Sequence, residues 1–174
     1  MRFALLSLVA STRIILIMGV AGSGKTTVGQ ALATQLAWPY FEADDFHSAA
    51  NKAKMAAGTP LDDDDRAPWL ASIRSKIDAC RATGTCAVFT CSALKKKYRA
   101  VLLGGVPEAG LVYLRGDVAM IAERVAQRQD HYMKAGMVES QFAALEPPGD
   151  ALTIDTKGQR PDEIVATVRQ HFGL

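Results

Sequence analysis

Short apolar runs alternate with longer amphipathic stretches along most of this chain. The run 14–18, Ile-Ile-Leu-Ile-Met, is apolar throughout and rich in β-branched residues, which is typical of a strand covered on both faces. After it, Val28, Leu32 and Leu36 recur every four residues and predict the buried face of a helix over 25–36. Shorter apolar runs predict four further strands, at 39–42, 86–90, 110–114 and 151–154. Strands that alternate with helices in this way predict an α/β fold with a parallel sheet.

Three other stretches carry helical patterns. One apolar stripe, with Pro68 near the first turn of its predicted helix, consists of Trp69, Leu70, Ile73, Ile77 and Cys80. The last helix is predicted to open at 161–163, where a proline and two acids stand in the favoured N-terminal order, and to bury Ile164, Val165, Val168 and Phe172. A further helical stretch is predicted at 46–57, with Asp45 as its candidate N-cap.

The length of 174 residues favours a single domain, which we predict to span 13–174. Hydrophobic residues make up 49% and charged residues 22% of the chain, which excludes a disordered or fibrous protein. A formal net charge of +2 gives no support to a nucleic-acid partner. Residues 1–12 are predicted to be a leader or extension outside the fold. Their apolar stretch mimics a short signal peptide, and the run 14–18 is too short to span a membrane.

Cysteine usage favours a reducing compartment. Cys80, Cys86 and Cys91 are odd in number and no pair has C-x-x-C spacing. The spacing therefore predicts free thiols and indicates neither a disulfide framework nor a zinc site.

Residues 19–26, Gly-Val-Ala-Gly-Ser-Gly-Lys-Thr, match the phosphate-binding pattern G-x-x-x-x-G-K-[ST] between a predicted strand and a predicted helix. The glycines let backbone N–H groups approach phosphate oxygens, and the helix N-terminus adds a positive dipole end. Lys25 is a candidate catalytic residue that reaches the β- and γ-phosphates, and Thr26 is a candidate Mg²⁺ ligand. The predicted nucleotide-binding residues are Gly19, Val20, Ala21, Gly22, Ser23, Gly24, Lys25, Thr26 and Thr27. The predicted cofactors, ATP and Mg²⁺, favour a cytoplasmic protein.

The phosphate motif alone leaves the class of nucleotide-binding protein open. A GTPase needs N-K-x-D, but the stretch 51–54 ends in Lys54 instead of an aspartate. The D-x-x-G match at 155–158 stands too close to the C-terminus for a γ-phosphate switch. The chain is also short for a motor module, so a small phosphoryl-transfer enzyme is the favoured class.

Acidic residues follow the second predicted strand, where ligands of an open parallel sheet bind. Asp44 is the candidate general base, because a carboxylate there accepts a hydroxyl proton as the oxygen attacks the γ-phosphorus. His47 is a candidate hydrogen-bond partner for a polar substrate, and a plain surface histidine is the alternative.

Several stretches closely resemble the gluconokinase family. They are Asp44 to His47, Asn51, Lys54-Met55, Gly58, the run 60–70 (Pro-Leu-Asp-Asp-Asp-Asp-Arg-Ala-Pro-Trp-Leu) and the run 91–99 (Cys-Ser-Ala-Leu-Lys-Lys-Lys-Tyr-Arg). The resemblance implies ATP-dependent phosphorylation of D-gluconate at its 6-hydroxyl, usually by a homodimer. We therefore predict a P-loop three-layer sandwich with a five-stranded parallel sheet of order 2-3-1-4-5 and a helical lid at about 124–145.

Gluconate needs cations for its carboxylate and polar groups for its hydroxyls. The candidate substrate-binding residues are Asp44, His47, Arg66, Ser92, Lys95, Tyr98, Arg99 and His131. The alternative for the lysines at 95–97 is a solvated helix face. The four acids at 62–65 are interpreted as a solvated loop and helix N-terminus, because four consecutive acids cannot all face one metal ion.

The lid that the resemblance implies carries Arg124 and Arg128, which lie four residues apart on one helix face. Both are candidate catalytic residues that neutralise charge on the transferred phosphoryl group, and surface pairing with Glu123 or Asp130 is the alternative. The loop 155–161 is expected to border the adenine.

Two positions depart from the family pattern, because Glu42 stands where an aspartate is common and Ser48 where a proline is common. No standard Walker-B aspartate follows the third strand, so Mg²⁺ is expected on Thr26, phosphates, water and Asp44. The alternative functions are a kinase of another small metabolite such as shikimate and a nucleotide-binding regulatory protein without turnover.

Overall fold

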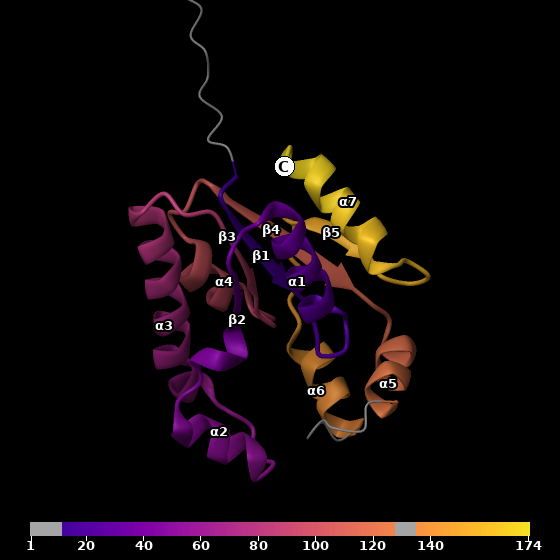
Figure 1. Cartoon of the computed structure of the whole chain (residues 1–174). Coiled ribbons are helices and arrows are strands. Elements are labelled where there is room, and N and C mark those ends of the chain that lie inside the picture. Colours follow the sequence, from indigo (N-terminus) through magenta and orange to yellow (C-terminus); the bar gives the residue numbers. More distant parts are fainter. Residues whose placement is uncertain (1–11, 128–134) are drawn as a thin grey trace, which may run out of the picture.

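The computed structural model describes residues 12–127 and 135–174, and the predicted sheet is confirmed. Its strands are β1 (Ile14–Met18), β2 (Tyr40–Glu42), β3 (Ala87–Thr90), β4 (Ala109–Arg115) and β5 (Leu152–Asp155). They pair in parallel in the order β2-β3-β1-β4-β5, which is the predicted order (Figure 1).

Seven α-helices and one 3-10 turn lie between and after these strands in the described residues. They are α1 (Lys25–Leu36), η1 (Ala43–Phe46), α2 (Ala49–Ala56), α3 (Asp63–Ala82), α4 (Lys96–Leu103), α5 (Val118–Ala126), α6 (Ala135–Ala144) and α7 (Pro161–Phe172). No helix among the described residues has the length and apolarity needed to cross a membrane. Cys80, Cys86 and Cys91 are free thiols, as predicted.

The sheet is the middle layer of three, and β1 shows why. All five of its residues are buried, because alternate side chains enter different cores. Leu16 packs in a cluster with residues of α3 and α4, whereas Ile17 packs in another with residues of α1 and α7. Figure 1 shows α3 and α4 on one side of β1 and α7 on the other.

A third apolar cluster joins α5 and α6 to the loop after β1. It contains Val20 of that loop, Leu94, Ile121 and Val125 of α5, and Val138 of α6. Apolar contacts therefore hold α6, which lies in the predicted lid segment, and α5, whose end reaches into it, against the phosphate motif.

Two helix starts differ from the sequence expectation. The cap of α2 is Ser48, whose hydroxyl accepts from the Asn51 N–H at 3.1 Å, because Asp45 lies within η1. The start of α3 precedes Pro68 by more than one turn, so that Pro68 lies inside the helix. The cause is a capping box: the Asp65 N–H donates to Asp62 at 2.8 Å, and the Asp62 N–H donates to Asp65 at 3.0 Å. The interpretation of 62–65 as a helix N-terminus is confirmed.

Candidate functional site

The phosphate cradle, residues 19–26, connects β1 to α1 and has the shape that phosphate binding requires. Gly22 and Gly24 have φ of 78° and 97°, a region that favours glycine and turns successive N–H groups inward. The Lys25 ammonium donates to the Val20 carbonyl at 2.9 Å and so lies over the loop. Ser23 is 1% exposed, and its hydroxyl has no hydrogen-bond partner among the described residues. A nucleoside phosphate supplies the anionic oxygens that such a cradle accepts.

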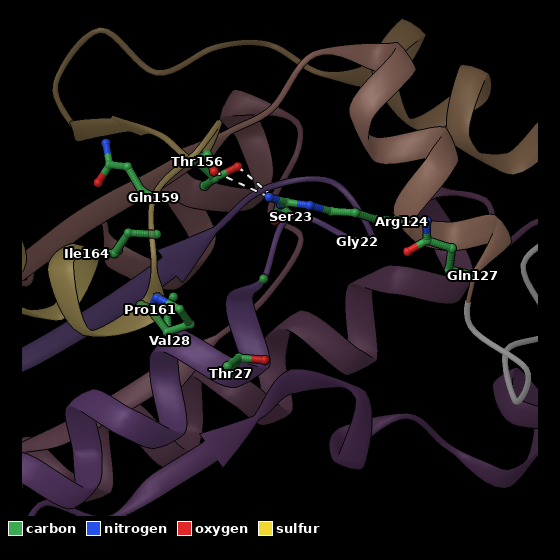
Figure 2. Close-up of a pocket in the computed structure, with 11 residues that line it drawn as sticks. Gly22, Ser23, Thr27, Val28, Arg124, Gln127, Thr156, Gln159, Pro161 and Ile164 are labelled. Atoms are coloured by element: carbon green, nitrogen blue, oxygen red, sulfur yellow. Dashed lines mark hydrogen bonds between the residues drawn. The ribbon is translucent and has the colours of Figure 1, made fainter.

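A cavity of about 370 Å³ lies beside the cradle, and we call it the nucleoside cavity (Figure 2). It is lined by Gly22, Ser23, Gly24, Thr27, Val28, Arg124, Gln127, Thr156, Gln159, Pro161 and Ile164. Its walls therefore come from the cradle, α1, α5, the loop after β5 and the start of α7. Three residues of the loop 155–161, which was expected to border the adenine, line it.

The Arg124 side chain reaches across the nucleoside cavity from α5 (Figure 2). Its guanidinium donates to the Thr156 hydroxyl at 3.4 Å and to the Thr156 carbonyl at 3.3 Å. The other lid candidates, Arg128 and His131, lie outside the described residues.

Asp44 lies in η1, directly after β2. The Trp69 indole N–H donates to the Ala43 carbonyl at 2.7 Å, and this buried bond anchors η1 to α3. Asp44 is open to solvent, yet the surrounding protein raises the pKa of its carboxyl above the usual range by desolvation and, secondly, by the charge of Glu42. The charges of His47 and Lys25 act in the opposite direction on this pKa. Asp44 therefore shares one electrostatic neighbourhood with the cradle lysine.

His47 stacks on Trp69, with ring centroids 4.4 Å apart and ring planes inclined by 9°. Burial lowers the pKa of His47, the charge of Asp44 opposes this change, and the charge of Arg66 adds to it. The imidazole is therefore neutral at pH 7. Its buried Nδ1 has no hydrogen-bond partner among the described residues.

Glu42 forms a network that sequence reasoning missed. Its Oε2 accepts from the Thr26 hydroxyl at 2.9 Å and from the Tyr40 hydroxyl at 2.6 Å. The Tyr40 oxygen also lies 2.7 Å from the Thr90 hydroxyl. Burial and the Glu42 carboxylate raise the pKa of Tyr40 far above its ordinary value, so that Tyr40 stays a hydrogen-bond donor.

Thr26 and Glu42 of this network are candidate ligands of Mg²⁺. A hydroxyl and a carboxylate are hard oxygen donors of the kind that Mg²⁺ prefers, and Mg²⁺ usually keeps several waters and phosphate oxygens. The described residues contain no group of three or more His, Cys, Asp and Glu side chains suited to a metal ion. Thr26 with Glu42 thus fits a metal that is held largely by phosphates and water.

A second charged cluster joins the start of α3 to the start of α4. Asp63 accepts from the Tyr98 hydroxyl at 2.5 Å, pairs with Lys95 at 3.4 Å and also pairs with Lys97. These partners hold the pKa of Asp63 well below its usual range, with Lys97 as the largest cause. The Arg66 guanidinium lies 5.8 Å from the centre of the Tyr98 ring. The structure therefore brings three predicted substrate-binding residues together, around a carboxylate.

The predicted substrate-binding residues Arg99 and Ser92 make other contacts. Arg99 is 8% exposed, and its Nη1 donates to the carbonyls of Ala93 and Leu94, each at 3.0 Å. These bonds hold the segment between β3 and α4 in place. Ser92 is half-buried, and its carbonyl accepts from the Gly19 N–H at 3.4 Å, so the segment lies against the cradle.

The fold and the site together define the class. A phosphate cradle after β1 of a 2-3-1-4-5 parallel sheet, with acids at the end of β2, is the arrangement of a P-loop kinase of small molecules. A family model described as an AAA domain matches residues 14–148.

Relatives narrow the class further. The chain is 41% identical over 162 residues to a gluconokinase of Gluconobacter oxydans, covering 92% of this chain and 91% of the relative. It is 43% identical over 152 residues to a probable gluconokinase of Mus musculus, covering 78% and 83%. A crystal structure of a gluconokinase from Sinorhizobium meliloti matches with a TM-score of 0.82 at 36% identity, covering 94% and 93%. The chain belongs to the gluconokinase family.

Proposed function

We propose that this protein transfers the γ-phosphoryl group of ATP to the 6-hydroxyl of D-gluconate and so forms 6-phospho-D-gluconate. The observation that carries the proposal is the 2.9 Å hydrogen bond from Thr26 of the cradle to Glu42 at the end of β2, close in sequence to Asp44, whose pKa responds to the charges of Glu42 and Lys25. It supports a carboxylate base and a phosphate-binding cation acting on one reacting centre. Family membership supports gluconate as the acceptor.

The residues divide into phosphate, metal and acceptor groups. Bound ATP with Mg²⁺ supplies the phosphoryl group and an electrophilic phosphorus. The cradle N–H groups and Lys25 neutralise phosphate charge, and Thr26 and Glu42 are the residues that would hold the metal. Asp44 accepts the proton of the attacking hydroxyl. Arg66 and Lys95 pair with the gluconate carboxylate, and the neutral His47 hydrogen-bonds a hydroxyl.

The substrate assignment is tested by coupled ADP release with a panel of sugar acids and shikimate. Turnover restricted to gluconate is expected. Turnover with shikimate alone would instead identify a shikimate kinase. Tight ATP binding with no turnover on any acceptor would identify a regulatory nucleotide-binding protein.

Arg124 is expected to act on nucleotide affinity, because its guanidinium lies in the nucleoside cavity. Arg124→Ala is predicted to raise the KM for ATP about 10- to 100-fold, the value of one lost hydrogen bond to a charged group, with a much smaller change in kcat. Steady-state kinetics at varied ATP measure both. Arg115→Ala, at an exposed arginine paired with Asp155, is the matched control. A fall in kcat at unchanged KM would instead support the catalytic role predicted from the sequence.

We further propose that the protein acts in the cytoplasm and forms a homodimer. ATP is abundant in the cytoplasm, and free thiols suit its reducing conditions. Sedimentation velocity with the full chain measures the assembly state, and a single species with the mass of one chain would contradict the homodimer.

A further inference from the structure

Gln141 of α6 contacts the phosphate cradle directly. Its side-chain oxygen Oε1 accepts a hydrogen bond from the Ala21 N–H at 2.7 Å, although the two residues are far apart in the sequence. In Figure 1, α6 lies just below the loop that leads into α1. The side chain of a lid-segment helix therefore occupies a backbone donor of the cradle, in a loop whose N–H groups suit phosphate oxygens.

The position of α6 is built into the fold on both sides of Gln141. Before it, Val138 packs in the apolar cluster with Val20 of the cradle. After it, the Glu146 N–H donates to the Leu94 carbonyl at 2.9 Å, and the Glu146 carboxylate accepts from the Lys96 N–H at 2.5 Å. These contacts fix the helix beside the cradle and leave the Gln141 side chain as the group able to change partners.

The location within the cradle points to the terminal phosphate. Gly22, Ser23 and Gly24 line the nucleoside cavity, whereas Ala21 does not. Gln141 thus contacts the cradle outside the part that faces the nucleoside. A nucleotide that starts in that cavity and runs along the cradle brings its outermost phosphate toward the remaining donors.

Glutamine suits this place because its amide has two different ends. The oxygen accepts from a backbone N–H, and the NH₂ group donates two hydrogen bonds. A phosphate oxygen only accepts, so it displaces the amide oxygen from the Ala21 N–H and binds the NH₂ group when the amide turns over. Methionine offers neither end, and glutamate offers only the accepting one.

We propose that Gln141 is a binding residue for the γ-phosphate: without nucleotide its oxygen accepts from the Ala21 N–H, and with ATP bound its NH₂ group donates to the γ-phosphate. The proposal rests on the nucleotide of the proposed function and not on gluconate. ADP leaves the Gln141–Ala21 bond intact, so Gln141 contributes to the preference for ATP over ADP. It also couples α6 to the presence of the phosphoryl group that is to be transferred.

Isothermal titration calorimetry with Mg²⁺, ADP and a non-hydrolysable ATP analogue tests this without gluconate. Gln141→Glu keeps an acceptor for the Ala21 N–H but cannot donate and adds a negative charge. It is expected to weaken binding of the ATP analogue about 10- to 100-fold and binding of ADP by a few-fold at most. Gln141→Met is expected to weaken the ATP analogue less than Gln141→Glu does and to leave ADP binding nearly unchanged.

Gln127→Glu is the matched control, because it places the same charge in the nucleoside cavity. It is expected to weaken the ATP analogue and ADP equally. Thermal unfolding without nucleotide checks that each variant folds, and the Gln141→Glu protein is expected to melt at or above the wild-type temperature.

Equal weakening of both nucleotides by Gln141→Glu, or no weakening, would overturn the proposal and leave Gln141 as a structural contact between α6 and the cradle. A selective loss of the ATP analogue in a protein that phosphorylates no sugar acid would support Gln141 while refuting the proposed function. Failure of the wild-type protein to bind either nucleotide would refute both.

Discussion

Replacement of Asp44 by asparagine is expected to lower kcat by about 10²- to 10⁴-fold, the usual contribution of a general base. Asparagine keeps the size and shape of the side chain but cannot accept the hydroxyl proton. The Trp69–Ala43 bond that anchors η1 is untouched, so the fold and ATP binding are expected to persist. Steady-state kinetics with gluconate and calorimetry with ATP measure the two effects separately.

The neighbouring carboxylate provides the control. Asp45 lies in the same 3-10 turn and is exposed, so Asp45→Asn removes one negative charge at nearly the same place. It is expected to change kcat only slightly. Equal losses in the two variants would show that net charge near the cradle matters and would remove Asp44 as the base.

The pH dependence of turnover is a second test of Asp44 as the general base. Desolvation and the Glu42 charge raise the pKa of Asp44, and the base acts only when it is ionised. Turnover is therefore expected to be full above this raised pKa and to fall as the pH drops through it, above the ordinary aspartate range. This acidic decline should be missing from the residual activity of the asparagine variant.

The sheet could be predicted because its signal is local. Five consecutive apolar residues make β1 recognisable as a buried strand, whereas the order of the strands was predicted from the resemblance to the gluconokinase family. The cradle is equally local, since its glycines, Lys25 and Thr26 are contiguous. The last helix begins at Pro161 as predicted, because proline and acids mark a helix start within a few residues.

Contacts between distant segments escaped prediction. Glu42 looked like a departure from a family pattern, and only the pairing of β2 with β3, which places Glu42 beside Thr90, brings its carboxylate near Thr26. Gln141 carries no local mark of its contact with Ala21. An arginine in a basic run, Arg99, gave no sign that its guanidinium is buried against two carbonyls. Asp45 was expected to cap the helix that Ser48 caps, because residue type alone does not reveal the 3-10 turn that contains Asp45.

Replacement of Gly19 by alanine is expected to lower the free energy of unfolding by about 2–5 kcal/mol. The loss has two causes: the added Cβ has too little space, and alanine disfavours the backbone conformation of residue 19. A Cβ on Gly19 would lie 2.7 Å from the Leu114 carbonyl oxygen and 2.7 Å from the Ser23 hydroxyl, both closer than real Cβ contacts. Leu114 is fully buried in β4, and Ser23 is 1% exposed, so neither atom has room to retreat. Overpacking of about 1–3 kcal/mol adds to about 1–2 kcal/mol for an alanine at a φ of 151°.

Gly58→Ala separates the two contributions. Gly58 has a φ of 77°, and a Cβ there would meet nothing within 4 Å, so this variant pays only for conformation. Urea unfolding is expected to shift the midpoint at unchanged slope for both variants, and the loss of unfolding free energy is expected to be larger by about 1–3 kcal/mol for Gly19→Ala. Addition of ATP and Mg²⁺ should raise the melting temperature of the Gly58 variant but not that of the Gly19 variant, because only the second deforms the cradle. Equal midpoints, or a full response of the Gly19 variant to nucleotide, would show that the cradle tolerates a side chain at its first residue.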